Sequence, residues 1–403
     1  MNHQPSRSFF DTDQFTSKLS VSHSSKVQSA RAKAMLLARG VQDTPHLFSN
    51  QEFKQDNYAY NNGNWEVNSK RSVPTEVYLP GGITSKIYVR PWSPLKIVSD
   101  NNPDQPSYAI YDGDRFVSEC SFLPTPNFWN FETELGTPTR KLAQLYGRTC
   151  ININIYSGCQ FFGVKKQCAF CSVQPTQIEH GKAVIKKSPA DVADACRLAV
   201  EHDEVNWFLQ TGGSYLNSDT EFDRHVEVLK AIRPHLPWNG RFKGNVALMP
   251  PRDLSRIVEL YDLGVDHPAF NLEVWPRSAF EKFCPGKAKY VGFDHIIDAM
   301  TEIVRHYGPG WGWCNFVGGL VPLDDQKAGF TFVAERGIIP GANIYHPDIG
   351  ATVSHEQDSP SEDYILSLYA HAAELYHRYN YKPFFDAEVL RNSLANEAYE
   401  GLF

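Results

Sequence analysis

Three cysteines, Cys159, Cys168 and Cys171, stand close together on a loop-like segment that also carries Gly158 and Gly163. Thiolates gathered in this way hold a zinc ion or an iron–sulfur cluster. Three ligands leave one iron of a four-iron cluster free to bind something other than protein. The spacing therefore indicates a metal centre with an open position, which favours chemistry over a purely structural role.

The same cysteines are also compatible with simpler roles. Two cysteines two residues apart are common in structural zinc sites, and His180 stands near enough in the sequence to complete a Cys3His set. Unligated buried thiols are the plainest alternative, because free cysteine is often buried. The Gly, Lys and Gln residues between the cysteines are not typical of a core. Cys284 is a further candidate ligand, and a fourth thiolate would close the open position.

The segment Cys168-Ala-Phe-Cys171 resembles the radical S-adenosylmethionine (radical SAM) superfamily, whose last two cysteines have the same gap and an aromatic residue, here Phe170, before the second. Eight residues separate Cys159 from Cys168, where the family usually has three, so the chain resembles an atypical member. The resemblance implies a [4Fe–4S] cluster on Cys159, Cys168 and Cys171. It also implies S-adenosyl-L-methionine (SAM) on the fourth iron, cleaved reductively to a 5'-deoxyadenosyl radical.

The same resemblance assigns SAM contacts to later segments. Gly212 and Gly213 stand where the family binds the SAM amino group through its backbone, although Ser214 replaces the usual acid. Asn271 and Glu273 belong to an Asn-Leu-Glu similar to a fourth-strand motif of the family. Each assignment has a structural alternative, such as a plain turn, a polar strand edge, a surface lysine or core packing. The further candidates for SAM or its adenine are Phe170, Lys287, Gly318 and Tyr345.

From about residue 148 the sequence alternates between strand and helix patterns. Six strands with helical crossovers predict a parallel α/β sheet, and a curved sheet of this length is a partial (β/α)6 barrel. Active groups in such folds follow the carboxyl ends of strands, as the cysteines do here. The strands are expected over 149–156, 205–210, 244–249, 267–275, 314–320 and 338–345, and the helices over 190–202, 223–232, 253–262, 295–307 and 326–335.

Alternation along the expected strand 267–275 separates two pairs of side chains. Asn271 and Glu273 would point to one face, and Leu272 and Val274 to the other. If the polar face is the barrel interior, two buried polar groups need partners there. A bound ligand would supply them.

Four regions follow from the sequence. Residues 1–72 are polar, with expected disorder over residues 1 to about 22 and a helix over 24–39 that Ser24 or Ser25 caps and Gly40 ends. Residues 73–147 are expected to form a small, β-rich accessory region with a hairpin at Asp112-Gly113. Its strands are expected over 75–79, 86–90 and 108–122. Residues 148–350 would form the barrel and 351–403 a C-terminal extension, with helices over 361–379 and 386–398.

Composition narrows the class of protein. The 39 basic and 46 acidic residues give a net charge of -7, which argues against nucleic acid as a partner. The first 20 residues lack the apolar segment of a secretory signal, and no run of 18 apolar residues occurs. Eight cysteines in such a chain fit reduced thiols, so a cytoplasmic location is expected.

The sequence as a whole predicts an oxygen-sensitive radical SAM enzyme with a single cluster, because no second group of cysteines follows Cys171. We expect a small-molecule substrate in cofactor or natural-product biosynthesis. An external one-electron reductant such as flavodoxin or ferredoxin would supply the electron. The alternatives are a zinc-stabilised, non-redox α/β binding protein and an iron–sulfur electron carrier.

Overall fold

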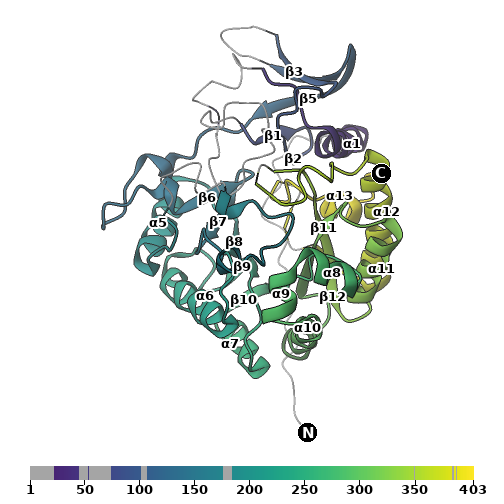
Figure 1. Ribbon diagram of the computed structural model, residues 1–403. Helices are drawn as coiled ribbons and strands as arrows, with labels where there is room; N and C mark the ends of the chain where they lie inside the picture. The colour runs from purple at the N-terminus through teal and green to yellow at the C-terminus, as the bar shows by residue number, and fades with distance from the viewer. Residues whose placement is uncertain are drawn as a thin grey trace.

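The computed structural model describes residues 22–44, 53, 74–100, 107–175, 184–348, 350–383, 385–386 and 388–403. The disorder expected at the N-terminus falls outside these residues, and so does His180. The described chain forms a larger sheet of seven strands and a smaller sheet of five. Helices cover the outer side of the larger sheet (Figure 1).

The larger sheet has the order β12-β11-β10-β9-β8-β7-β6 and is open, since no pairing of β12 with β6 is found in the described part of the chain. Its six parallel strands follow one another in chain order, which confirms the predicted parallel α/β arrangement. An antiparallel edge strand, β6 (Ala143–Tyr146), was not expected, because four residues are too few to show alternation. The parallel strands are β7 (Cys150–Asn154), β8 (Trp207–Thr211), β9 (Phe242–Ala247), β10 (Val265–Ala269), β11 (Gly312–Gly318) and β12 (Ile338–Ile344).

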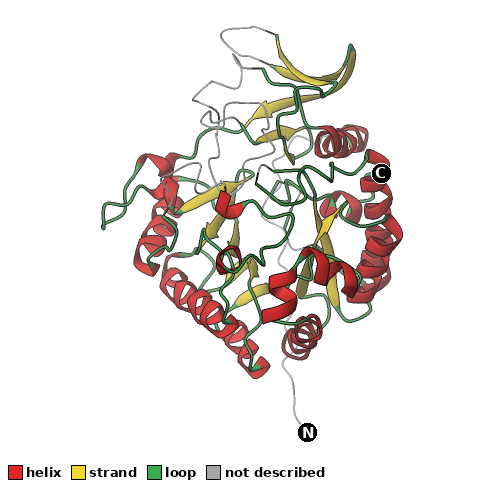
Figure 2. Ribbon diagram, in the orientation of Figure 1, coloured by secondary structure: helices red, strands yellow, loops and turns green. Residues whose placement is uncertain are grey.

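Helices connect the successive parallel strands of this sheet (Figure 2). The longer ones bury an apolar stripe. In α10, for example, Ile296, Ala299, Met300 and Ile303 recur at the three- and four-residue spacing of one helix face and are all buried. Two short helices, α8 and α9, were not predicted, because they are too short to show such a stripe. The helices are α5 (Pro189–His202), α6 (Ser218–Ile232), α7 (Val258–Asp262, after a 3-10 turn), α8 (Arg277–Phe283), α9 (Pro285–Tyr290), α10 (Phe293–Tyr307) and α11 (Leu323–Ala334).

The strand expected over 267–275 is wrong in its second half. β10 ends at Ala269, and the backbone beyond it is irregular, with Glu273 in the left-handed region at φ 66°. The neighbouring strand β11 holds this segment in place. Asn315 N donates to Asn271 Oδ1 at 2.9 Å, and Glu273 N donates to Asn315 O at 3.2 Å.

The smaller sheet is antiparallel, with the order β2-β1-β5-β4-β3. The hairpin at Asp112-Gly113 is confirmed, since Asp112 pairs with Arg115 across Gly113 at φ 61°. The strand expected over 86–90 is wrong, because β2 ends at Lys86 and begins directly after a turn at Gly81-Gly82, whose φ values are both positive. The strands are β1 (Glu76–Leu79), β2 (Ile83–Lys86), the unexpected β3 (Leu95–Ser99), β4 (Tyr108–Asp112) and β5 (Arg115–Phe122).

Two of the three predicted terminal helices form. Helix α1 (His23–Arg39) ends at Gly40 as expected, but its N-cap is Ser22 rather than Ser24 or Ser25. Helix α12 (Glu362–Tyr379) is also present. The helix expected over 386–398 is wrong for most of its length, since only α13 (Ala395–Tyr399) is helical. No helix in the described ranges is long and apolar enough to cross a membrane.

The segment 388–393, which we call the C-terminal strap, crosses the open side of the larger sheet instead. Ile344 N on β12 donates to Asn392 O at 3.0 Å, and Asn392 Nδ2 donates to Ile344 O at 3.1 Å. At the other edge, the Arg391 guanidinium lies 3.7 Å from the centroid of the Tyr146 ring on β6. Lys86 N donates to Arg391 O at 2.8 Å, so the strap also joins the smaller sheet. In the strap, hydrogen bonds to distant segments thus take the place of the helical hydrogen bonds that were expected over 386–398.

Candidate active site

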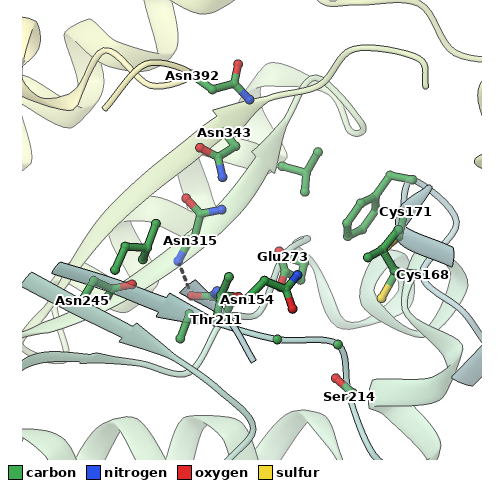
Figure 3. A pocket seen from close by; sticks show the side chains of 18 of the residues that line it. Asn154, Cys168, Cys171, Thr211, Ser214, Asn245, Glu273, Asn315, Asn343 and Asn392 are labelled. Atoms are coloured by element: carbon green, nitrogen blue, oxygen red, sulfur yellow. Dashed lines mark hydrogen bonds between the residues drawn. The ribbon is translucent and has the colours of Figure 1, made fainter. Parts of the chain in front are cut away.

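A chamber of about 380 Å³ lies where the parallel strands end. It is lined by the cysteine loop, the loop after β8, the irregular segment after β10, inward side chains of β11 and β12, and the C-terminal strap (Figure 3). Two residues considered from the sequence do not line it: Gly318, whose open side faces Ile344 and Leu368, and Cys284. The proposed residues that do line it are Cys159, Cys168, Phe170, Cys171, Gly212, Gly213, Asn271, Glu273, Lys287 and Tyr345.

The cysteine loop is anchored to the loop that follows β8. Gln160 N donates to Ser214 O at 2.8 Å, and Leu216 N donates to Gln160 Oε1 at 2.8 Å. Gly213 N also donates to Tyr156 O at 2.8 Å. These bonds hold Cys159, directly after β7, beside the glycine pair.

The three thiols lie within electrostatic reach of one another. Burial raises the pKa of Cys159 to about 11, and the neighbouring Cys168 adds to this shift. Burial also raises the pKa of Cys171 above its ordinary value, again with a contribution from Cys168. Burial thus opposes the thiolate forms of Cys159 and Cys171, and a metal centre would supply the positive charge that stabilises them.

The three cysteines supply sulfur donors around one chamber. Thiolates are the ligands of iron–sulfur clusters, so the chemistry of this donor set fits such a cluster. Thiolates also bind zinc. In the described part of the chain, no group of three or more His, Cys, Asp or Glu side chains is found that could hold a metal ion.

Gly213 is required by the packing of the cysteine loop. A Cβ on Gly213 would overlap the carbonyl oxygen of Gly158 and stand 3.1 Å from the Cβ of Cys159. A Cβ on Gly212 would meet Ile155 Cγ1 at 3.1 Å. The sequence suggested that this glycine pair admits a ligand, and the structure adds that Gly213 admits the cysteine loop itself.

A carboxylate that the sequence did not indicate lies beside Ser214. Glu221 on α6 is 1% exposed and lines the chamber. Tyr215 N and Met249 N donate to its two oxygens at 3.0 and 2.8 Å. Burial raises the pKa of Glu221 to about 7. An acid is therefore present at this place, although it follows Ser214 by seven residues.

Lys287 and Glu273 form an ion pair in the chamber wall. Their charged atoms are 2.6 Å apart, and the side chains are 7% and 14% exposed. Lys287 Nζ also donates to Asn271 O at 3.2 Å. Burial alone lowers the pKa of Lys287, but Glu273 and Cys168 raise it overall above its ordinary value. The site therefore presents a fixed positive and a fixed negative charge next to each other.

The expected separation of side chains around Glu273 is present despite the irregular backbone. Asn271 and Glu273 line the chamber, whereas Leu272 and Val274 are fully buried on the other side. The alternation thus assigned the faces correctly in a segment that is not a regular strand.

Most of the polar wall was missed by sequence reasoning. Asn315 on β11 and Asn343 on β12 point into the same space as Asn392 of the strap (Figure 3). Asn315 pairs with Gly341 in register, and the Trp313 ring occupies the space that a Cβ on Gly341 would need. The usable signal in the sequence was strand alternation, which places Asn315 and Asn343 on one face of their strands. The amide side chains around the chamber are Asn154, Asn245, Asn271, Asn315, Asn343 and Asn392.

A chain of buried polar groups connects the cysteine loop to the smaller sheet. Ser172 Oγ donates to Asp348 Oδ2 at 3.1 Å, and Asp348 Oδ1 lies 3.0 Å from His346 Nδ1. Lys86 Nζ on β2 contacts His346 Nε2. Burial lowers the pKa of His346. The accessory region thus contributes a lysine to the chamber.

Comparison with known proteins gives one curated relative of note, and no family model matches the chain. Bacteriochlorophyllide c C-7(1)-hydroxylase of Chlorobaculum limnaeum is 28% identical over 133 residues, which are 33% of this chain and 33% of the relative. The chain thus matches about a third of that protein's length. The chain resembles the radical SAM superfamily.

Solved structures show weaker likenesses. Methylornithine synthase (PylB) has a TM-score of 0.41 at 13% identity, covering 61% of this chain and 71% of that one. HydG, a maturase of the [FeFe]-hydrogenase, has a TM-score of 0.41 at 16% identity, covering 58% and 51%. The radical S-adenosylmethionine methyltransferase TsrM of Kitasatospora setae has a TM-score of 0.37 at 15% identity, covering 52% and 38%. Likenesses this distant assign no reaction to the chain.

Proposed function

We propose that this protein is a radical SAM enzyme whose larger sheet is a partial (β/α)6 barrel. One observation carries the proposal. Three thiols from one loop and the Lys287–Glu273 ion pair line the same chamber at the carboxyl ends of parallel strands. Parallel α/β folds bind their ligands at this edge.

Cys159, Cys168 and Cys171 would hold a [4Fe–4S] cluster, and SAM would bind its fourth iron. With SAM bound, such a cluster supplies a 5'-deoxyadenosyl radical. The residues of the protein would bind and orient SAM and the substrate, and would shield the radical from water. Lys287 offers a positive charge to the carboxylate of SAM and Glu273 a negative charge to its amino group, so the adjacent charges suit a zwitterion. Phe170 and Tyr345 offer ring surfaces to the adenine.

We propose a small-molecule substrate in cofactor or natural-product biosynthesis. The chamber is bordered on its open side by the C-terminal strap, which favours a compact substrate and limits water around a radical. The curated relative acts on bacteriochlorophyllide c, which is also a small molecule. An electron carrier needs no such chamber beside its cluster. A flavodoxin or ferredoxin in the cytoplasm would supply the electron.

Anaerobic reconstitution with iron and sulfide tests the proposal directly. We expect about four iron and four sulfide per chain, because three thiolates around one chamber suit a cubane cluster. Dithionite and SAM should then yield 5'-deoxyadenosine, measured by liquid chromatography. Stoichiometric zinc without sulfide would favour the zinc-stabilised binding protein. A full cluster that leaves SAM intact would favour the electron carrier.

Glu273→Gln is expected to weaken SAM binding about ten- to hundredfold, since a hydrogen bond to a charged group contributes roughly 1.5–3 kcal/mol. Equilibrium binding of SAM to cluster-loaded protein measures this effect. Lys287 loses its charged partner in this variant, so the free energy of unfolding should also fall.

Leu272→Gln provides the matched comparison for Glu273→Gln. Leu272 is fully buried away from the chamber, so its replacement should cost roughly 1–3 kcal/mol of stability through an unpaired buried amide. The folded fraction should bind SAM normally. Unchanged SAM binding by Glu273→Gln, or weak binding by a stable Leu272→Gln protein, would contradict the assigned roles.

A further inference from the structure

The long gap between the first two cysteines of the loop folds into a short helix and an exposed turn. Helix α3 (Gln160–Gly163) directly follows Cys159. Val164, Lys165 and Lys166 come next and are all exposed, and Lys165 adopts the left-handed conformation at φ 54°. The extra length of this gap thus places two lysines on the surface, on the same loop as the proposed cluster ligands.

Helices α8 and α9 pack against this loop. The Phe161 ring on α3 stacks on the Tyr290 ring of α9, with 5.8 Å between the ring centroids. Ala169 N donates to the carbonyl oxygen of Phe283, the last residue of α8, at 2.8 Å. The ends of both helices are therefore direct neighbours of the cysteine loop.

Two further lysines lie beside these contacts. Lys282 Nζ is 5.0 Å from the centroid of the Phe283 ring, and Lys289 Nζ is 5.2 Å from the centroid of the Tyr290 ring. Both lysines are exposed, and neither lines the chamber. Together with the turn they form an exposed group that we call the basic patch: Lys165, Lys166, Lys282 and Lys289.

The charge of the basic patch is opposite to that of the whole chain, whose net charge is -7. Glu281 is the only acidic residue in the sequence segments 160–167 and 277–290, which together carry the basic residues Lys165, Lys166, Arg277, Lys282, Lys287 and Lys289. A surface of this kind attracts a partner of opposite charge and orients it during its approach. Because the patch lies outside the chamber, it serves a partner other than SAM or the substrate.

We propose that the basic patch docks an acidic one-electron redox protein, which reduces the cluster through the cysteine loop. The inference rests on the proposed function, since it needs a cluster on Cys159, Cys168 and Cys171. The partner loses one electron and the cluster gains it, so no bond forms or breaks. Docking at the loop that carries the ligands keeps the path of this electron short and leaves the chamber available to SAM.

Calorimetric titration of the cluster-loaded protein with a purified, acidic flavodoxin tests the docking without any turnover. The double variant Lys165→Glu/Lys166→Glu should bind flavodoxin about tenfold more weakly than the wild type at low ionic strength. Raising the salt concentration from about 50 to about 200 mM should weaken wild-type binding and narrow this difference, because salt screens exposed charges.

The matched control is the double variant Arg31→Glu/Lys230→Glu. It changes the net charge by the same amount, at two exposed residues of α1 and α6. These helices do not carry the basic patch, so the control should bind flavodoxin as the wild type does.

Reduction kinetics give a second measurement. At subsaturating concentration, reduced flavodoxin should transfer its electron to the cluster of Lys165→Glu/Lys166→Glu about tenfold more slowly than to that of the wild type. Dithionite needs no docking site, so it should reduce the clusters of the wild type and of both double variants to the same extent. Cluster absorbance follows both reactions.

Each of the following results would overturn the inference. Equal flavodoxin affinity of the wild type and Lys165→Glu/Lys166→Glu, or no measurable affinity of the wild type, would show that the patch is not a docking site. An equal loss in Arg31→Glu/Lys230→Glu would assign the effect to net charge alone. Impaired reduction of Lys165→Glu/Lys166→Glu by dithionite would place the effect in the cluster rather than in docking. Tighter binding of a short DNA duplex than of flavodoxin would make nucleic acid the partner. A wild-type chain that assembles no cluster would instead refute the proposed function, on which the inference depends.

Discussion

Replacing Cys159, Cys168 or Cys171 by Ala is expected to abolish the brown absorbance of the reconstituted protein and all 5'-deoxyadenosine formation. Each sulfur lines the same chamber, and the three lie within electrostatic reach of one another. Loss of any one thiolate leaves a second iron without a protein ligand, so the cluster loses an anchor as well as charge balance. Absorbance, iron content and SAM cleavage measure the outcome.

Cys314→Ala is a suitable control for these variants. Cys314 is fully buried in β11, where its sulfur accepts a hydrogen bond from Leu272 N at 3.4 Å. It does not line the chamber, so its replacement should keep the cluster and cost some stability. A variant of Cys168 that retained four irons and full activity would show that the metal centre lies elsewhere.

The parallel sheet and the grouping of the three cysteines at one chamber could be predicted, because both depend on patterns that are local in sequence. Six apolar segments alternate with helical stripes, and this pattern leads to a parallel sheet whose strands follow chain order. Cys168 and Cys171 stand on one short loop, so their spacing alone indicated metal binding. No distant contact had to be known in either case.

The parts that failed depend on contacts between distant segments. Nothing near residue 270 in the sequence indicates that β10 ends early. The backbone beyond β10 is held by a contact with a distant strand, in which Asn315 N donates to Asn271 Oδ1. The strap reads as a helix by its own pattern, yet Asn392 bonds to the edge of β12. Six amides converge on the chamber from as many separate segments, so local periodicity could not collect them.

Gly213→Val is expected to cost most of the bound iron, which differs from what the sequence alone suggested. The glycine pair first indicated a backbone that admits SAM, so that a larger side chain would weaken SAM binding and spare the cluster. The structure places the Gly158 carbonyl oxygen where the new Cβ would stand, with Cys159 directly beyond it. Cys159, the first of the three proposed cluster ligands, must therefore move. Overpacking of this kind typically costs roughly 1–3 kcal/mol of stability.

Gly163→Val separates this steric effect from a general sensitivity of the cysteine loop. Gly163 belongs to the same loop, but a Cβ there meets nothing within 4 Å, so the variant should keep its iron and its SAM affinity. Iron content, SAM binding and thermal unfolding of both variants, measured side by side, decide the matter. If Gly213→Val held a full cluster and bound SAM weakly, the glycine would serve the ligand rather than the loop. If both variants lost iron equally, the loop would be intolerant of any side chain, and the contact with Gly158 would explain nothing particular.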